Sequence, residues 1–248
     1  MVVIKEIFGR IFAVWGLAVF IITMLVVALP MWMIGLINEP KRTEVFRRIS
    51  KVWMSIFFTL TGCRLRVSGK QNFKPGENYI VLCNHNSFMD VPLSTPFIPG
   101  ANKTIAKIEM ARIPIFGLIY KRGSILVDRK DKASRSESFK KMKEVLGMGM
   151  HMCIYPEGTR NKTAEPLKAF HDGAFKLAID TQKPLLPAII FNTKKVLPSG
   201  KLFYFWPSKM ELHFLPPVPI LNSDNAEELK LKLFELMSSW YTACYKAS

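Results

Sequence analysis

The sequence predicts an α/β fold with a mostly parallel central sheet flanked by helices, preceded by an N-terminal two-helix membrane motif. Two observations lead to this prediction. Residues 11–38 carry no formal charge, and from residue 65 onward short apolar runs alternate with helical stretches. The 248 residues suffice for one substantial domain with an accessory segment, but not for two full domains. We therefore divide the chain into a membrane-inserted and amphipathic helical segment, residues 1–62, and a larger domain, residues 63–248.

The uncharged stretch at residues 11–38 is long enough to cross a bilayer, because a spanning helix needs roughly 20 predominantly apolar residues. Trp15 and Trp32 lie near its two ends, and tryptophan rings prefer the lipid–water interface. A cleaved signal peptide fits less well, because the run is too long and no A-x-A-like site follows it. We expect this helix to insert in a membrane, and both a spanning and a re-entrant helix remain open.

A basic cluster follows this helix, made of Lys41, Arg42, Arg47, Arg48 and Lys51. Each charge would cost about 2.5–3.5 kcal/mol at the centre of a bilayer, which excludes a second ordinary spanning helix here. Residues 52–60 are again largely apolar, so the pattern predicts an amphipathic helix at the membrane surface, with its basic side chains near lipid phosphates. The basic cluster also indicates an inner (cytoplasmic) membrane protein whose larger domain faces the cytoplasm.

The larger domain is predicted to alternate strands and helices. Short apolar runs bounded by turn signals predict buried strands at 79–83, 103–106, 124–127, 152–155 and 185–191. Helical periodicity predicts helices at 133–148, 169–180 and 225–245, and two further apolar runs predict edge strands at 202–206 and 210–215. Such alternation is typical of a parallel sheet covered on both faces, and ligands of these sheets bind at the carboxyl ends of the strands.

Composition narrows the possible partners. The net charge of +16 indicates an anionic partner, which is nucleic acid, an anionic membrane surface or a phosphorylated substrate. Four scattered cysteines form no C-x-x-C pair, so we interpret them as small buried side chains in a reducing, cytosol-facing compartment, rather than disulfide or zinc residues. The sequence contains no G-x-S-x-G nucleophile elbow and no nucleotide-binding glycine motif, which argues against a serine hydrolase and a kinase.

The first chemical motif follows the strand predicted at 79–83, where His85 and Asp90 are spaced as H-x-x-x-x-D. An aspartate on the first turn of the next helix can turn back and accept a hydrogen bond from one imidazole nitrogen. That bond fixes the tautomer and leaves the other nitrogen as a base near neutral pH. A histidine that merely caps a helix near an acid is the simpler alternative.

Two more motifs follow predicted strands. Residues 155–160 (Y-P-E-G-T-R) combine a tight turn with Arg160, whose planar fork suits a phosphate. Residues 122–129 form a strand bracketed by Arg122 and Arg129, and Lys107 follows the strand at 103–106. Each taken alone is equally explained by a surface turn, an edge strand with solvated ends or a solvated lysine.

Taken together, the motifs resemble those of the glycerolipid acyltransferase family, whose best-known members are the 1-acyl-sn-glycerol-3-phosphate acyltransferases. The resemblance spans roughly residues 65–220. The family's N-H-x-S-x-x-D motif is matched by Asn84, His85, Ser87 and Asp90; its arginine-ended strand by Gly123 through Arg129; its E-G-T-R motif by Glu157 to Arg160; and its proline-centred strand by Leu186, Pro187 and Ala188.

The resemblance implies transfer of a fatty acyl group from an acyl thioester to 1-acyl-glycerol-3-phosphate, giving phosphatidic acid. His85, oriented by Asp90, would remove the proton of the acceptor hydroxyl, which attacks the thioester without a covalent acyl-enzyme. The residues implied for the phosphate pocket are Arg129, Glu157, Gly158, Thr159, Arg160 and, as a weaker candidate, Lys107, with Asn84, Ser87 and Gly123 in support. No metal and no cofactor are expected. The implied partners are membrane lipids, lysophosphatidic acid and acyl-CoA or acyl carrier protein, and no nucleic acid.

Several alternatives stay open at this point. Family members often carry a basic pair where this chain has His171 and Asp172, so the acceptor could be another lyso-lipid, such as a lyso-aminolipid or lysophospholipid. The donor remains either acyl-CoA or acyl carrier protein, because both present a thioester. A non-enzymatic, membrane-tethered protein that binds anionic lipid would fit the charge, but it gives no reason for the two motifs at strand ends.

Overall fold

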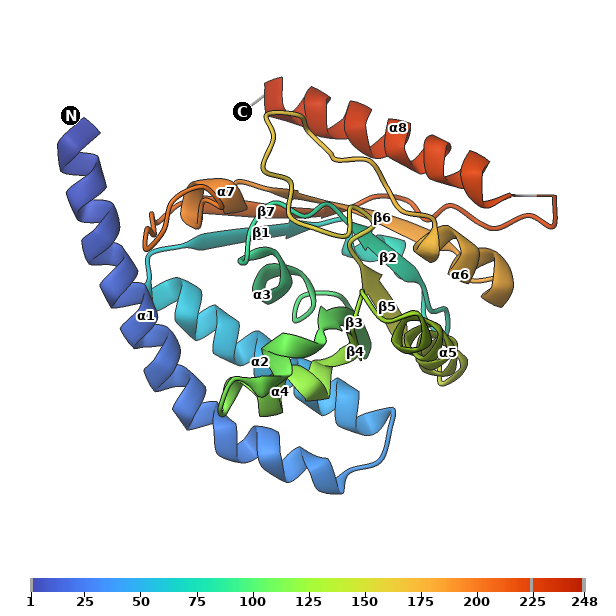
Figure 1. Cartoon of the computed structure of the whole chain (residues 1–248), viewed down its shortest axis with the longest axis horizontal. Helices are drawn as coiled ribbons and strands as arrows, with labels where there is room; N and C mark the ends of the chain where they lie inside the picture. The colour runs from blue at the N-terminus through green and yellow to red at the C-terminus, as the bar shows by residue number, and fades with distance from the viewer. Residues whose placement is uncertain (1, 224, 247–248) are drawn as a thin grey trace.

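A computed structural model describes residues 2–223 and 225–246 of the chain (Figure 1). The strands are β1 (Arg64–Ser68), β2 (Ile80–Cys83), β3 (Asn102–Lys107), β4 (Ser124–Val127), β5 (His151–Ile154), β6 (Leu185–Phe191) and β7 (Lys209–Phe214). The α-helices are α1 (Val2–Met33), α2 (Lys41–Leu60), α3 (Asp90–Ser94), α4 (Phe116–Gly123), α5 (Lys132–Gly147), α6 (Gly173–Thr181), α7 (Thr193–Val196) and α8 (Ala226–Lys246). Three short 3-10 helices are η1 (Ile34–Leu36), η2 (Lys70–Asn72) and η3 (Ile108–Arg112).

The strands form one sheet in the order β1-β7-β6-β2-β5-β3-β4. The five strands from β6 to β4 run parallel, β7 is antiparallel to β6, and β1 is parallel to β7. The predicted α/β fold with a mostly parallel sheet is therefore confirmed. Side chains alternate between the two faces, so that Val81 and Cys83 join one apolar core whereas Ile80 and Leu82 join the other.

Helices cover both faces of the sheet. One core contains buried residues of α1, α2, α3 and α4, and the other contains residues of α5, α6 and α8. Figure 1 shows α1, α2 and α4 on one side of the sheet and α5, α6 and α8 on the other. Burial of both faces explains why the central strands β2 and β6 are continuous apolar runs rather than alternating apolar and polar residues.

The N-terminal segment is a pair of packed helices. The Trp15 indole donates to the carbonyl of Leu60 at 2.9 Å, and the Trp53 indole donates to the Thr23 hydroxyl at 2.9 Å. The stretch Val3–Leu36 has a mean hydropathy of 2.7 in its most apolar window and is long enough to cross a membrane. Only 22% of that window is buried, so α1 presents most of its apolar surface outward, as a membrane-associated helix does.

A partly buried carboxylate joins this helix pair to the sheet. Glu39, in the turn before α2, accepts hydrogen bonds from Arg42, Thr43 and the Lys103 ammonium of β3, the last at 2.8 Å. Burial opposes ionisation of Glu39, but these three donors outweigh it and lower its pKa to about 2. The carboxylate therefore stays charged at any physiological pH and holds the start of α2 against β3.

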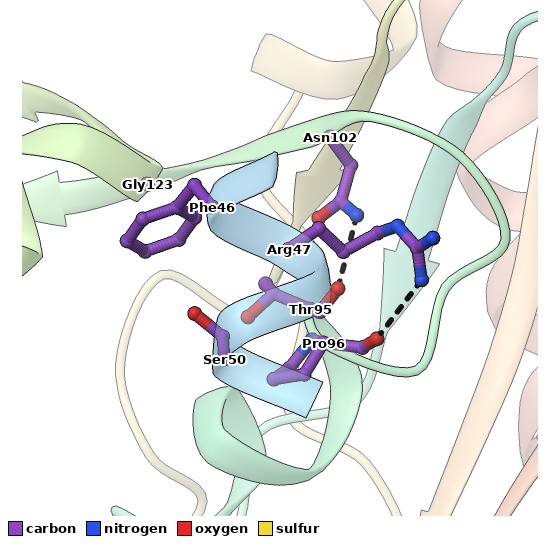
Figure 2. Close-up of a pocket in the computed structure, with 7 residues that line it drawn as sticks. All are labelled: Phe46, Arg47, Ser50, Thr95, Pro96, Asn102 and Gly123. Atoms are coloured by element: carbon purple, nitrogen blue, oxygen red, sulfur yellow. Dashed lines mark hydrogen bonds between the residues drawn. The ribbon is translucent and has the colours of Figure 1, made fainter. Parts of the chain in front are cut away.

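The next turns of α2 pack against the loop between α3 and β3. Figure 2 shows a small cavity here, where the Arg47 guanidinium donates to the carbonyl of Pro96 and the Asn102 amide donates to that of Thr95. Gly123 ends α4 beside this cavity. A Cβ added at Gly123 would lie 2.5 Å from the Phe46 ring. Gly123, named as a supporting residue in the sequence analysis, therefore allows α2 to pack closely against the end of α4.

Four local features differ from the sequence predictions. Residues 202–206 form a loop rather than an edge strand, and β7 lies inside the sheet between β1 and β6 rather than at its edge. The strand β1 and the helix α4 were not predicted. Helix α2 ends at Leu60 and β1 begins at Arg64, on either side of the predicted boundary between residues 62 and 63.

Candidate active site

The predicted site residues follow four strands that are consecutive in the sheet, in the order β2-β5-β3-β4. These strands are parallel, so their carboxyl ends lie along the same edge. His85 follows β2, Glu157 follows β5, Lys107 ends β3 and Arg129 follows β4. One edge of one sheet therefore brings together motifs that lie as far apart as 75 residues in the sequence.

The centre of the site is the pair of His85 and Asp90. The imidazole Nδ1 lies 2.8 Å from Oδ2 of Asp90, which is fully buried, whereas the His85 side chain keeps 19% of its surface exposed. A carboxylate at Nδ1 favours the tautomer with its proton on that nitrogen. Nε2 is then the nitrogen left to accept a proton at the partly exposed side of the ring.

Asp90 is held in place by the same loop that carries His85. Its Oδ2 also accepts the backbone N–H groups of Asn86 at 2.5 Å and Ser87 at 2.7 Å. The other carboxylate oxygen, Oδ1, is buried and makes no hydrogen bond to the described residues. Oδ2 of Asp90 therefore accepts three hydrogen bonds, which together fix the conformation of the His85 loop and the orientation of the imidazole ring.

Asn84 and Ser87 tie this loop to the neighbouring chain. The Asn84 side chain bonds both backbone groups of Ile190, donating to its carbonyl at 2.9 Å and accepting from its N–H at 2.7 Å. The Ser87 hydroxyl donates to the carbonyl of Leu197 at 2.7 Å. The two residues, which the sequence analysis named as supporting residues, hold the His85 loop against β6 and against the segment that follows it.

Glu157 lies under the same loop rather than at the surface. Its side chain is fully buried, and its two carboxylate oxygens accept the backbone N–H groups of His85 at 2.7 Å and Lys168 at 3.1 Å. Burial raises its pKa from an ordinary 4.5 to about 7, although the two N–H donors act in the opposite direction. The structure thus shows Glu157 bracing His85, and its implied part in phosphate binding stays a prediction.

Two residues that the sequence reasoning missed also contact His85. The Tyr155 ring centre lies 4.6 Å from the imidazole centre, and its hydroxyl is 2.6 Å from that of Ser94 in α3. The backbone N–H of Asn161 donates to the carbonyl of His85 at 2.6 Å. Both residues directly flank the P-E-G-T-R sequence, and their position there was the available signal.

Of the basic residues predicted for the site, Arg160 contacts the His85 loop and Arg129 contacts the E-G-T-R turn. The Arg160 guanidinium lies 3.6 Å from the ring centre of Phe88, which is itself 59% exposed. The Arg129 guanidinium donates to the carbonyl of Gly158, and Lys107 is paired in register with Val127, two residues before Arg129. The structure therefore places Arg129 and Lys107 on adjacent strands and connects Arg129 to the E-G-T-R turn.

The E-G-T-R turn packs closely against the residues that follow it. Gly158 has a positive φ of 68°, and a Cβ there would lie 2.7 Å from the His171 ring. Thr159 accepts a hydrogen bond from the Lys168 ammonium at 2.8 Å. Glycine is required at position 158 both by the backbone angle and by the nearby imidazole.

Asp172 is paired with cations of the helices α6 and α8. Its carboxylate accepts a hydrogen bond from the Lys230 ammonium of α8 at 2.9 Å, and a second cation, Lys176, lies 3.8 Å away. The hydrogen bond from Lys230 is the main reason that the pKa of Asp172 lies below its usual range. The acidic residue that departs from the family pattern is therefore neutralised by a distant helix.

The part of the chain that the structure describes contains no group of three or more His, Cys, Asp or Glu side chains arranged to hold a metal ion. An imidazole paired with a buried carboxylate is an arrangement capable of proton transfer.

Comparison with known proteins decides the family. The family model described as Acyltransferase matches residues 64–191, just over half of the chain and all four strand ends of the site. The chain belongs to the acyltransferase family. Among the relatives of this acyltransferase, the 1-acyl-sn-glycerol-3-phosphate acyltransferase of Helicobacter pylori is 35% identical over 72% of this chain and 74% of its own length.

Other relatives extend the same likeness. The alpha forms of 1-acyl-sn-glycerol-3-phosphate acyltransferase from Bos taurus and Homo sapiens are each 33% identical over 64% of this acyltransferase. The match covers only 56% of the length of these mammalian relatives. The crystal structure of the 1-acyl-sn-glycerophosphate (LPA) acyltransferase PlsC from Thermotoga maritima has a TM-score of 0.80 at 23% identity and covers 99% of this chain and 98% of that one. This last likeness supports the fold of the acyltransferase, including its N-terminal helices.

Proposed function

We propose that this acyltransferase transfers a fatty acyl group from an acyl thioester to the free hydroxyl of 1-acyl-sn-glycerol-3-phosphate, giving phosphatidic acid. The observation that carries the proposal is the 2.8 Å contact between His85 Nδ1 and the buried carboxylate of Asp90, at a sheet edge bordered by arginine and lysine. The names of the relatives from Helicobacter pylori and from mammals support 1-acyl-sn-glycerol-3-phosphate as the acceptor.

The proposed mechanism uses His85 as a general base. Nε2 accepts the proton of the acceptor hydroxyl while the hydroxyl oxygen attacks the carbonyl carbon of the thioester. The carbon–sulfur bond of the thioester then breaks. The imidazolium returns the proton to the departing thiolate, so the enzyme ends the cycle unchanged. Asp90 stabilises the imidazolium through the bond to Nδ1, and such positioned bases contribute typically about 10²–10⁴-fold in rate.

The acceptor's phosphate is proposed to bind to the cations beside His85. Arg160 offers a planar fork, and Arg129 and Lys107 add positive charge from adjacent strands. The carboxylate of Glu157 contributes through the backbone of His85, since it is buried and both its oxygens already accept N–H groups. A phosphate held at this edge would place a neighbouring glycerol hydroxyl near Nε2.

The donor is proposed to be acyl-CoA or acyl carrier protein. Both present the same thioester, and a basic surface suits the phosphates of CoA as well as an acidic carrier protein. The acceptor is a membrane lipid, which fits a domain packed against the apolar helix α1. From the basic residues that follow α1, we propose that the catalytic domain faces the cytoplasm at the cytoplasmic membrane.

The test is acyl transfer from a labelled thioester to lysophosphatidic acid by the purified protein in detergent, beside the variant His85→Ala. We expect product from the wild type and a loss of nearly all turnover in the variant. His213→Ala is the matched control, because His213 bonds to Ser68 and Glu211 on β1 and β7, away from the four strand ends of the site. Wild-type rates in a clean, folded His85→Ala preparation would refute the general-base assignment.

The same assay decides the acceptor. Product with lysophosphatidic acid as acceptor, but not with a lyso-aminolipid or other lysophospholipid, supports the proposed substrate. No product with lysophosphatidic acid, but product with another lyso-lipid that His85→Ala abolishes, would refute this acceptor and keep the mechanism. A folded protein that binds anionic lipid vesicles and acylates none of these acceptors would instead support the alternative of a non-enzymatic protein that binds anionic lipid.

A further inference from the structure

The loop between α7 and β7 holds the N-terminal half of α1. We call residues 198–206 the clasp loop. The backbone N–H of Phe205 donates to the carbonyl of Gly9 at 3.0 Å, and the Lys201 ammonium forms an ion pair with Glu6. The ring of Tyr204 covers Gly9, where a Cβ would overlap it. This segment, predicted as an edge strand, uses its backbone and rings to bind a helix instead.

Two apolar side chains of the clasp loop pack against α1, and two others are exposed. Tyr204 and Phe205 are 6% and 4% exposed, and the Phe205 ring lies against Gly16 of α1. The two preceding residues do the opposite: Leu202 is 92% exposed and Phe203 is 48% exposed. Phe203 also has a positive φ of 52°, which an aromatic residue rarely adopts. The turn thus directs two large apolar side chains outward beside α1.

The end of α1 that the clasp loop holds is the end that carries charge. Lys5, Glu6 and Arg10 lie here, and no formal charge follows on α1. Charged residues at the end of an apolar helix lie at the level of the lipid headgroups. Lys201 and the ring of Trp206, over which the Lys5 ammonium lies 5.2 Å from the centre, add the mixture of cation and aromatic ring typical of that level.

We propose that the clasp loop is a bilayer contact of its own, separate from the two N-terminal helices, with Leu202 and Phe203 inserted in the interfacial layer of the membrane. The occupant is lipid rather than protein because the loop continues the outward apolar surface of α1 at the same end, where Val3 and Ile7 are 71% and 54% exposed. Apolar side chains of this size gain free energy on leaving water, and a neighbouring cation is attracted to lipid phosphates.

This contact would hold the active site at a fixed height above the bilayer. The clasp loop begins one residue after Leu197, whose carbonyl accepts the Ser87 hydroxyl of the His85 loop, and the N–H of Trp206 donates to the carbonyl of Val196. The membrane would then be contacted both along α1 and at Leu202, in the loop that is joined to the His85 loop. A domain held at two points keeps its orientation to the membrane, which a single flexible anchor does not.

The test places an environment-sensitive fluorophore at Leu202→Cys in full-length protein that also carries Cys244→Ser. The other three cysteines are buried. The labelled protein is reconstituted in vesicles of phosphatidylcholine and phosphatidylglycerol, with or without acyl-chain bromination. Leu25→Cys, on the outward side of α1, is the lipid-contact reference, and Glu137→Cys, exposed on α5 across the sheet, is the water reference.

We expect the label at position 202 to shift to shorter wavelength in vesicles and to be quenched by brominated lipid, as at position 25 and unlike at position 137. Quenching by aqueous iodide but not by brominated lipid, at the level of position 137, would place the loop in water and overturn the proposal. The readout needs no acyl transfer, so it stands or falls independently of the acceptor and of His85.

Discussion

The role of Asp90 can be separated into charge and position by two substitutions. In Asp90→Asn, the side-chain amide oxygen can occupy the place of Oδ2, which accepts all three donors, and the NH₂ group then takes the place of Oδ1. The Nδ1 proton and the ring orientation are kept, and only the negative charge is lost. In Asp90→Ala, the acceptor for His85 disappears altogether.

The expected magnitudes follow from this geometry. A unit charge about 4 Å from the imidazolium is worth about 4 kcal/mol at an effective dielectric constant of about 20, and charged hydrogen bonds measure about 1.5–3 kcal/mol. Loss of about 2–4 kcal/mol lowers kcat roughly 30- to 1,000-fold for Asp90→Asn. Loss of orientation as well lowers kcat about 10⁴-fold for Asp90→Ala, the order of the loss when the aspartate of a catalytic triad is removed.

Single-turnover acyl transfer in detergent, with saturating lysophosphatidic acid and thioester, measures the effect without interference from product release. Asp180→Asn is the matched control, because Asp180 makes an exposed ion pair with Lys143 on the outer helices, and it should change kcat less than twofold, about the effect of a surface substitution. Equal losses in Asp90→Asn and Asp90→Ala would refute the separation of charge from position. A wild-type rate in Asp90→Ala would remove Asp90 from the mechanism.

Three further predictions concern other parts of the site and its support. The pKa of Glu157 is raised from 4.5 to about 7 in the folded state, so its protonated form stabilises the protein below pH 4.5. About 3 kcal/mol of the free energy of unfolding is lost as the pH rises through 7. Thermal melting from pH 4.5 to 8 should show this decline in wild type and a flatter profile in Glu157→Gln. Arg160→Ala should lower kcat/KM for lysophosphatidic acid about 10- to 100-fold through a higher KM, and Arg160→Lys should recover part of this loss. An unchanged kcat/KM in Arg160→Ala would remove Arg160 from the pocket. Gly123→Ala should lower the melting temperature at a cost of about 1–3 kcal/mol, because its Cβ meets the Phe46 ring, and unchanged melting would show that α2 can shift.

The buried strands could be predicted from sequence because the sheet is covered on both faces. Apolar runs at 124–127 and 185–191 match β4 and β6 residue for residue; β6 is buried along its whole length inside the sheet, and β4, the last strand of the sheet, still buries Ile125 and Val127. The site followed from the same logic, because residues after parallel strands must meet at one edge. His85 and Asp90 needed only their spacing and the strand before them.

The errors lie where contacts distant in sequence decide the structure. Residues 202–206 have the composition of a strand, yet their N–H groups bond to Gly9 and Val196 and their rings pack on α1, which no local pattern reveals. The strand β1 is short and half exposed, so it shows no apolar run, and missing it made β7 seem to be an edge. The contact between Glu157 and the backbone of His85 was not predicted either, because it joins residues far apart in the sequence; the part of Glu157 in phosphate binding stays a prediction.

The packing of α2 has a practical consequence for producing this enzyme in soluble form. Trp53, Phe57 and Phe58 belong to the same core as the strands β2 and β6, so the amphipathic helix is part of the packing of the catalytic domain. Cutting the chain at residue 62 would remove the helices that cover one face of the sheet, together with Glu39, the ion-pair partner of Lys103. A water-soluble version would instead keep α2 and replace outward side chains such as Val52 and Ile56, which the domain does not need for its own packing.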